Sequence, residues 1–289
     1  MTDNAKAILW VTLGTALFSL VYASGKFAVG TAAPFQVVFL RYLSGFATVV
    51  AVTMIFGESF AQYKSARPQT HFARAVFGCY GGLAIIWSSA NMPLLDATAI
   101  SLLYVIFIVA LGVVLLKERI GPLHWFAIAL STLGAIVVMG ARGAFTSFDL
   151  SYQWPAAIAV AGALLIAFEA ILIRTLSQSE KSLTVLLHVN FFGIFLVAIP
   201  TAMTWQSVTL SEAGLILLLG PLAISAQYCV IRGYRLAEVS VVGPVDYSWL
   251  IFAGILGYWF FDEVPTLGVL AGTVLIGIGG LILALMKPR

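Results

Sequence analysis

The chain has 289 residues, of which 61% are hydrophobic and only 9% are charged. Soluble globular proteins carry about 25% charged residues, so 15 basic and 12 acidic side chains are too few to cover a water-facing surface. The mean hydropathy of +1.04 agrees with this view. Composition therefore excludes a soluble enzyme, a nucleic-acid-binding protein, a disordered chain and a receptor with a large extramembrane domain. It predicts an all-α polytopic protein that lies in the lipid bilayer.

Ten apolar stretches are long enough to cross a membrane, because a spanning helix needs about 20 apolar residues. Short turn-forming or charged segments separate them, so we expect no second domain outside the membrane. The predicted spans are 7–25, 34–57, 72–90, 96–116, 121–140, 153–173, 183–204, 211–231, 239–261 and 266–286. The first stretch has an alternative interpretation as a signal peptide with a cleavage site after Val21-Tyr22-Ala23.

The basic residues indicate how the chain is oriented. If the termini and loops are assigned alternately to two sides, twelve of the 15 Lys and Arg residues, Arg74 among them, fall on the side of the N-terminus. Only Lys26 and Arg142 fall on the other side, and Arg41 lies inside the second span. Because basic residues accumulate on the cytoplasmic side, both termini are predicted to be cytoplasmic in a multi-pass protein of the cell (inner) membrane.

The two halves of the chain match each other at an offset of 145 residues. The matching pairs are Gly112 with Gly257, Gly134 with Gly279, Glu118 with Glu263, and Tyr104 with Trp249. This predicts two five-helix repeats, residues 1–145 and 146–289. Because five is odd, the second repeat begins on the opposite side of the membrane and the repeats are inverted. Inverted repeats are typical of secondary transporters, although glycine-rich helices can also match by chance.

Several short motifs stand at ordered positions in both halves. They are Arg41-Tyr42, Leu115-Leu116-Lys117-Glu118-Arg119, Tyr234-Arg235-Leu236-Ala237-Glu238-Val239-Ser240, Gly243-Pro244-Val245, Phe261-Asp262-Glu263-Val264-Pro265-Thr266, Gly272 and Gly279-Gly280. In these motifs the whole chain resembles the drug/metabolite transporter (DMT) superfamily, EamA type, with two tandem EamA repeats. Within that family it is most similar to the YddG-like exporters of aromatic amino acids and related metabolites. It departs from the family at Lys117 and Asp262, where a glycine often precedes the Glu.

Ionisable side chains inside the spans are the first candidates for function, because a charge in the membrane costs several kcal/mol. Arg41 is predicted either to contact an anion such as a substrate carboxylate or to lock the fold by binding backbone carbonyls. Glu169 and Asp246 are predicted to bind an amine or carry a proton, or, for Glu169, to pair with Arg174 or a loop lysine. His188 is able to titrate near neutral pH, or it is a hydrogen-bonded packing residue.

Aromatic and small polar residues form a second group of candidates, because many of them share helix faces. Their rings and hydroxyls would suit a flat apolar solute with polar ends, although rings also pack helices and anchor them at membrane surfaces. Pro244 removes a backbone hydrogen bond inside the ninth span and predicts a kink that serves as a gate. The residues of this group are Tyr80, Trp87, Ser101, Tyr104, Gln227, Tyr228, Pro244, Tyr247 and Trp249.

The sequence contains no phosphate-binding loop, no metal-binding run and no nucleophilic serine motif, so we expect no enzymatic reaction, no metal and no cofactor. We expect a secondary transporter that exports small metabolites by alternating access. The resemblance implies amino acids, aromatic or related, as the small-molecule substrate. Proton coupling, a monomeric state and the exact solute stay open. The alternatives are a transporter of drug-like or nucleotide/sugar metabolites, a membrane-embedded lipid-modifying enzyme, an assembly subunit and a channel.

Overall fold

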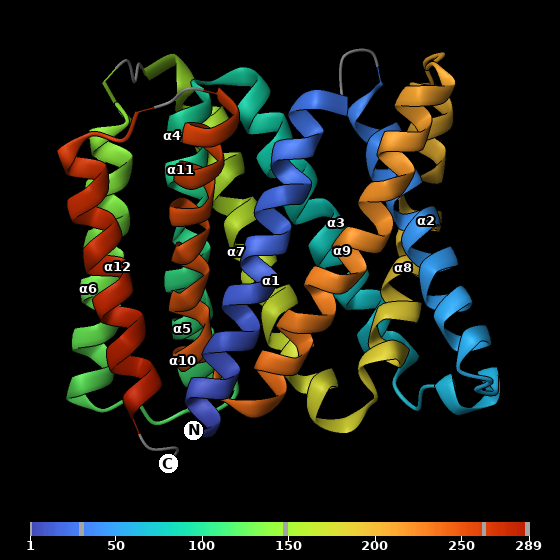
Figure 1. Ribbon diagram of the computed structural model, residues 1–289, viewed down its shortest axis with the longest axis horizontal. Helices are drawn as coiled ribbons and strands as arrows, with labels where there is room; N and C mark the ends of the chain where they lie inside the picture. Colours follow the sequence, from blue (N-terminus) through green and yellow to red (C-terminus); the bar gives the residue numbers. More distant parts are fainter. Residues whose placement is uncertain (1, 29–31, 147–149, 262–263, 287–289) are drawn as a thin grey trace.

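The computed structural model describes residues 2–28, 32–146, 150–261 and 264–286, and in these ranges every regular element is a helix (Figure 1). The long helices are α1 (Asp3–Ala28), α2 (Pro34–Ile55), α3 (Pro68–Asn91), α6 (Pro122–Ala141), α7 (Gln153–Ser179), α8 (Ser182–Met203), α9 (Leu210–Leu236) and α12 (Leu267–Leu285). The shorter ones are η1 (Phe60–Tyr63), α4 (Leu94–Ser101), α5 (Leu103–Leu115), η2 (Leu150–Tyr152), α10 (Val239–Val242), η3 (Gly243–Tyr247) and α11 (Ser248–Phe261).

Each of the ten predicted spans corresponds to a helix or to a stack of short helices. Over the described residues, nine stretches are long and apolar enough to cross a membrane, and α3 is not among them although it has 24 residues. The polar content of α3, which includes His71 and Arg74, lowers its apolarity. Both of these side chains are fully buried, so α3 keeps these two ionisable groups inside the protein.

The sequence places proline or a capping residue where several helices begin. Pro34, Pro68 and Pro122 each occupy the first turn of a helix, where the missing N–H has no partner to lose. At the start of α9, Thr209 accepts the backbone N–H of Glu212 while the Glu212 carboxylate accepts the N–H of Thr209. These signals fix where the chain re-enters the bundle.

The two ends of the described chain meet. The hydroxyl of Thr2 donates to the carbonyl of Ala284 at 3.0 Å, and the Asn4 amide donates to the carbonyl of Met286 at 3.1 Å. The start of α1 and the end of α12 therefore lie at one end of the bundle, which we call the terminal end (Figure 1). The other is the opposite end. This agrees with the even number of predicted spans.

Helix packing follows an approximate two-fold relation between the halves. α1 packs along α9 as α3 packs along α7, and α6 packs along α12 (Figure 1). A Cβ atom at Gly134 would lie 2.7 Å from the carbonyl oxygen of Gly272, and one at Gly279 would lie 2.8 Å from that of Ala127. These two contacts exchange under the offset of 145. Small residues thus allow α6 and α12 to approach closely in both repeats.

Two of the predicted spans are broken. The fourth is interrupted at Leu102, between α4 and α5. The ninth consists of α10, the 3₁₀ segment η3 and α11, and Pro244 lies in the first turn of η3. Tyr247 ends η3 and is the residue that matches Leu102 at the offset of 145. The distortion that Pro244 predicts is therefore present, and it has a counterpart in the first repeat.

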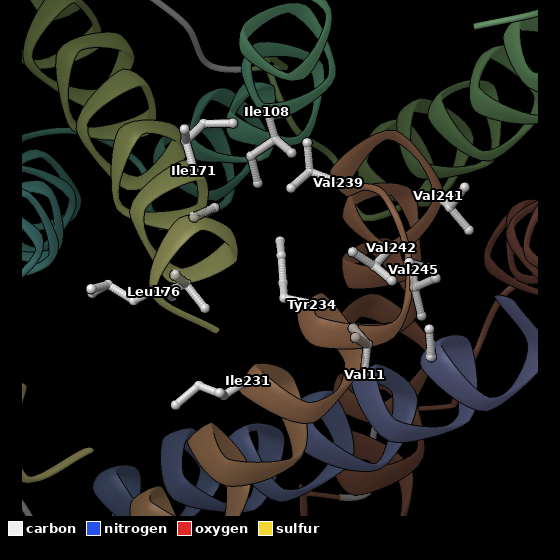
Figure 2. Close-up of a cluster of buried hydrophobic side chains, with 14 of the residues drawn as sticks. Val11, Ile108, Ile171, Leu176, Ile231, Tyr234, Val239, Val241, Val242 and Val245 are labelled. Atoms are coloured by element: carbon white, nitrogen blue, oxygen red, sulfur yellow. The ribbon is translucent and has the colours of Figure 1, made fainter. Parts of the chain in front are cut away.

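The largest hydrophobic cluster lies in the terminal half of the bundle. It joins α1, α5, α7, α9 and α10, and Figure 2 shows Val11, Ile108, Leu176, Tyr234 and Val239 converging there. In the opposite half the buried apolar residues form separate smaller clusters. Among the described side chains, the packing is thus continuous at the terminal end and divided at the opposite end.

Candidate functional site

An ion pair lies in the interior between α3 and α7. The guanidinium Nε of Arg74 is 3.6 Å from the Oε1 of Glu169, and their side chains are 0% and 16% exposed. The same guanidinium donates to the Gln227 side-chain oxygen on α9 at 3.0 Å and to the Val185 carbonyl on α8 at 3.3 Å. Four helices therefore meet at one arginine.

Arg74 requires a correction, because the count of basic residues placed it with the loops of the terminal side although the predicted span 72–90 contains it. α3 begins at Pro68, four residues before the predicted start at 72, so Arg74 lies nearly two turns inside the helix. Glu169 likewise pairs with Arg74, whereas Arg174, its expected partner, donates to the backbone carbonyl of Tyr234. The only indication in the sequence that Arg74 lies in the interior was its position at the start of an apolar stretch.

Gly78 makes room for the acid. A Cβ atom at Gly78 would lie 2.6 Å from one carboxylate oxygen of Glu169. Gly78 and Arg74 are four residues apart, so they lie on the same face of α3. The carboxylate therefore rests against bare helix backbone beside its guanidinium partner.

A small cavity adjoins this pair. It has about 10 Å³ of space, enough for roughly one water molecule. Its polar lining consists of Arg41, Tyr42, Asn190 and Gln227. Gln227 thus links the cavity to Arg74, and Arg41 acts electrostatically on Glu169. Two guanidinium groups and one carboxylate share this site, which we call the Arg74–Glu169 cluster.

Arg41 is half-buried, and its guanidinium carbon lies 5.0 Å from the centre of the adjacent Tyr42 ring. This is the spacing of a cation–π contact. Because Arg41 lines the cavity, its position is compatible with the predicted anion contact. The predicted site residues did not include Tyr42 and Asn190, which line the same cavity.

Asp246 forms a second polar group, at the break of the ninth span. Its carboxylate interacts with the side chains of Tyr104 and Thr15. The Thr15 hydroxyl donates its one hydrogen to the carbonyl of Val11 at 2.8 Å, so the Tyr104 hydroxyl is the donor to the carboxylate. Next to Asp246, the Tyr247 hydroxyl is 3.4 Å from that of Thr132. Asp246 therefore has neutral partners, in contrast to Glu169.

His188 is part of a histidine pair near the terminal end. Its ring stacks on that of His71 with the centroids 4.4 Å apart, and its Nδ1 lies 2.8 Å from the Thr184 carbonyl. The Nε2 of His71 is 2.7 Å from a carboxylate oxygen of Glu180. The sequence did not predict this pair, because His71 lies 117 positions earlier, on a different helix.

The remaining candidates are scattered. Tyr80 and Trp87 are 52% and 46% exposed on one side of α3 and do not line the cavity. Tyr228 meets the ring of Trp10 edge-on at 6.2 Å. Ser101 donates to the Thr98 carbonyl at 2.7 Å, and Trp249 packs on a buried cluster of the opposite half.

Glu118, one of the motif residues, caps α10. Its two carboxylate oxygens accept the backbone N–H groups of Val239 at 2.7 Å and Ser240 at 3.0 Å. A carboxylate at a helix N-terminus satisfies free donors and complements the helix dipole. This contact ties the first repeat to the second at the terminal end. The matching residue Glu263 lies outside the described residues, as does Asp262.

Comparison with known proteins identifies the family to which this architecture belongs. Residues 5–140 and 153–285 each match the EamA-like transporter family. The chain is 26% identical to a pseudopaline exporter of Pseudomonas aeruginosa, over 97% of this chain and 96% of the relative. It is 27% identical to a riboflavin transporter of Rhizobium johnstonii, over 93% and 87%. It is 23% identical to an S-adenosylmethionine uptake transporter of Rickettsia bellii, over 92% and 90%.

A solved structure with 22% identity superposes with a TM-score of 0.83, covering 96% of this chain and 98% of that chain, and it shows the same fold. The finer resemblance to aromatic amino acid exporters has no counterpart in these three relatives, which are named for other solutes. The two family matches together span most of the sequence. The chain therefore belongs to the EamA-like transporter family and is a multi-pass membrane transporter of small metabolites, not an enzyme.

Proposed function

We propose that this transporter exports amino acids, aromatic or related, across the cell (inner) membrane by alternating access, with both termini in the cytoplasm. The Arg74–Glu169 cluster carries the proposal. It holds a carboxylate beside two guanidinium groups, and Arg41 and Gln227 line the adjoining cavity. A free amino acid is a zwitterion, so its carboxylate complements a guanidinium and its ammonium complements Glu169.

The excess of positive charge favours the carboxylate of the solute. Glu169 already balances Arg74, so the second guanidinium, that of Arg41, is the one that a solute carboxylate would neutralise. Arg41 is half-buried and lines the cavity, which holds roughly one water molecule and must widen before a solute carboxylate can reach the fork of donors. Bidentate binding of a carboxylate is what a guanidinium does better than an ammonium.

The division of the hydrophobic core supports alternating access. The terminal end is packed as one cluster and the opposite end as several. Exchange of these arrangements between two symmetry-related repeats would open the terminal end and close the other. The matching breaks at Leu102 and at η3 are positions where backbone dihedral angles can change. In the proposed orientation the present state faces outward.

Asp246 is the proposed proton carrier. It lies at the break in the ninth span, and its partners Tyr104 and Thr15 are neutral. Protonation would therefore remove a charge that no cation balances in this group. Such a group can couple its proton to a change in the local backbone.

Transport in reconstituted liposomes tests the substrate. Liposomes that hold the purified protein should exchange radiolabelled phenylalanine or threonine well above empty liposomes. Arg41→Gln should slow the exchange at least tenfold, whereas Arg119→Gln, an exposed arginine outside the cavity, should leave it unchanged. Absence of flux above empty liposomes for every amino acid tried would overturn the substrate assignment.

The same liposomes test a second solute class. Because similar proteins are named for riboflavin and S-adenosylmethionine, both compounds belong in the assay as competitors of labelled phenylalanine. Amino acid export predicts that unlabelled phenylalanine competes best. If riboflavin alone drives exchange, the chain carries that solute class and the amino acid proposal fails.

A further inference from the structure

A second, larger cavity of about 450 Å³ lies at the terminal end, away from the Arg74–Glu169 cluster. It is walled by the turn after α5, the last turns of α7 and the turn between α9 and α10. Cavities of this size hold small organic molecules. The lining residues are Arg67, Leu116, Lys117, Glu118, Arg174, Thr175, Gln178, Ser179 and Glu238.

The charged side chains around this cavity differ in how many contacts they already make with the rest of the protein. Both carboxylate oxygens of Glu118 accept backbone N–H groups, so that acid is directed at the start of α10. Arg174 donates to the carbonyl of Tyr234 and interacts electrostatically with Glu118 and Glu238. Arg67 and Lys117 are exposed at the rim and add two further positive charges. Three basic and two acidic side chains line the cavity, and the exposed ones at the rim are both basic, so the rim favours anions.

Lys117 has an unusual backbone conformation. Its φ angle is +57°, in the left-handed region that favours glycine and that costs free energy for a lysine. This is also the position at which the family often has glycine. A strained residue that persists is a pointer to function. At this strained position the chain carries a cation on the rim of the cavity, although a glycine would adopt the same backbone conformation with less strain.

The walls of the cavity also carry contacts that close the terminal end. Glu118, in the first repeat, accepts a backbone N–H at the start of α10 in the second repeat. Arg174 on α7 donates to the backbone carbonyl of Tyr234 in the last turn of α9. A solute that enters from this end must pass these contacts. An anion bound by Arg174 would compete with the Tyr234 carbonyl for the same donors.

We propose that this cavity is a loading site, which binds the carboxylate of the solute through Lys117, Arg67 and Arg174 before the terminal end opens. The identity of the solute rests on the proposed amino acid export, but the binding of a carboxylate does not. The site is distinct from the Arg74–Glu169 cluster, which shares no lining residue with it. It acts on solute arriving from the terminal side only.

Transport measured separately from each side tests this asymmetry. In inside-out membrane vesicles phenylalanine meets the terminal end first, and in right-side-out vesicles it meets the opposite end first. Lys117→Gly should raise KM about tenfold in inside-out vesicles and leave KM unchanged in right-side-out vesicles. Lys117→Arg should keep the wild-type values. Arg119→Gly, which removes a neighbouring exposed cation outside the cavity, is the matched control.

Thiol labelling tests carboxylate binding without transport. Both native cysteines are buried, so a cysteine introduced as Ser179→Cys supplies a new reactive thiol in the cavity wall. It should react faster with an anionic methanethiosulfonate than with a cationic one, and benzoate should slow its labelling. Added Lys117→Gly should remove both effects. Ala61→Cys, exposed at the same end and outside the cavity, should show neither.

The outcomes separate the two proposals. If benzoate protects Ser179→Cys while no amino acid is transported, the loading site stands and amino acid export fails. If phenylalanine is transported but benzoate gives no protection and Lys117→Gly changes KM equally from both sides, the loading site is wrong. An equal effect of Arg119→Gly would also overturn it, because the cause would then be general surface charge.

Discussion

The two repeats share a backbone plan and differ in chemistry. The break at Leu102 matches the end of η3, and the close contact of Gly134 matches that of Gly279. The charged residues inside the long helices and at the break of the ninth span do not match in this way. Arg74 corresponds to Leu219 and Asp246 to Ser101 at the same offset of 145. The helix break and the glycine contact, which occur in both repeats, are the elements that a motion between two states would need in each repeat. These polar groups occur once, as the proposed binding site and the proposed proton carrier would require.

The largest effect should come from an unmatched charge. Arg74→Met leaves the mostly buried Glu169 carboxylate without its ion-pair partner, and breaking a buried pair in this way typically costs about 3–5 kcal/mol. Unfolding of the purified protein by heat should show that loss. Leu219→Met at the matching buried position should cost less than about 1.5 kcal/mol.

A double variant gives the decisive control. Combining Arg74→Met with Glu169→Met removes both charges and should recover most of the stability, because no charge is then stranded. If Arg74→Met alone is as stable as the wild type, the ion pair does not organise the interior.

The matched glycines should give the next largest effect, and an equal one in both repeats. Gly134→Ala and Gly279→Ala each place a methyl group within 2.8 Å of a carbonyl oxygen of the facing helix. Such overpacking costs about 1–3 kcal/mol. Gly280→Ala, which meets nothing within 4 Å, is the control and should not lower the unfolding temperature. Clearly unequal losses at Gly134 and Gly279 would argue against the two-fold relation.

Asp246→Asn should change stability little and transport strongly. The amide can still hydrogen-bond with Tyr104 and Thr15, so the cost should stay within about 1 kcal/mol. Because asparagine carries no titratable proton, accumulation driven by a proton gradient should be lost while equilibrium exchange persists. Accumulation and exchange in the same liposomes are the measurements. Undiminished accumulation would remove Asp246 as the proton carrier.

The smallest effect is expected at the residue that matches Asp246. Ser101→Ala removes one hydrogen bond to the Thr98 carbonyl, and such bonds within a membrane average about 0.6 kcal/mol. We expect accumulation within about threefold of the wild type, since a lost bond of that size changes an equilibrium by less than about threefold. A loss as large as that of Asp246→Asn would show that both breaks take part in coupling.

The features of the fold that could be predicted were those that depend on short stretches of neighbouring residues. The spans, the cap at Thr209 and the distortion at Pro244 each depend on neighbours a few positions away. The repeat was visible because small residues recur where helices approach. The EamA membership followed from those motifs, whereas the solutes of the named relatives did not.

The candidate site was predicted only in part. Arg41, Glu169 and Gln227 belong to one cluster, but Arg74, Tyr42 and Asn190 complete it and were missed. The histidine pair was missed as well, because His71 lies on a different helix from His188. Tyr80 and Trp87 share a face as their spacing predicts, yet that face does not line the cavity.

By itself the sequence determined which segments are apolar enough to enter the membrane and that its halves correspond. Those properties depend on the transfer of each segment into an apolar phase, which is a sum over local residues. Only the tertiary structure decided which acid pairs with which base, that Lys117 is strained beside a cavity and that the buried apolar residues of the terminal half form one cluster. Such pairings depend on distances between helices that are remote in sequence, and hydropathy carries no information about them.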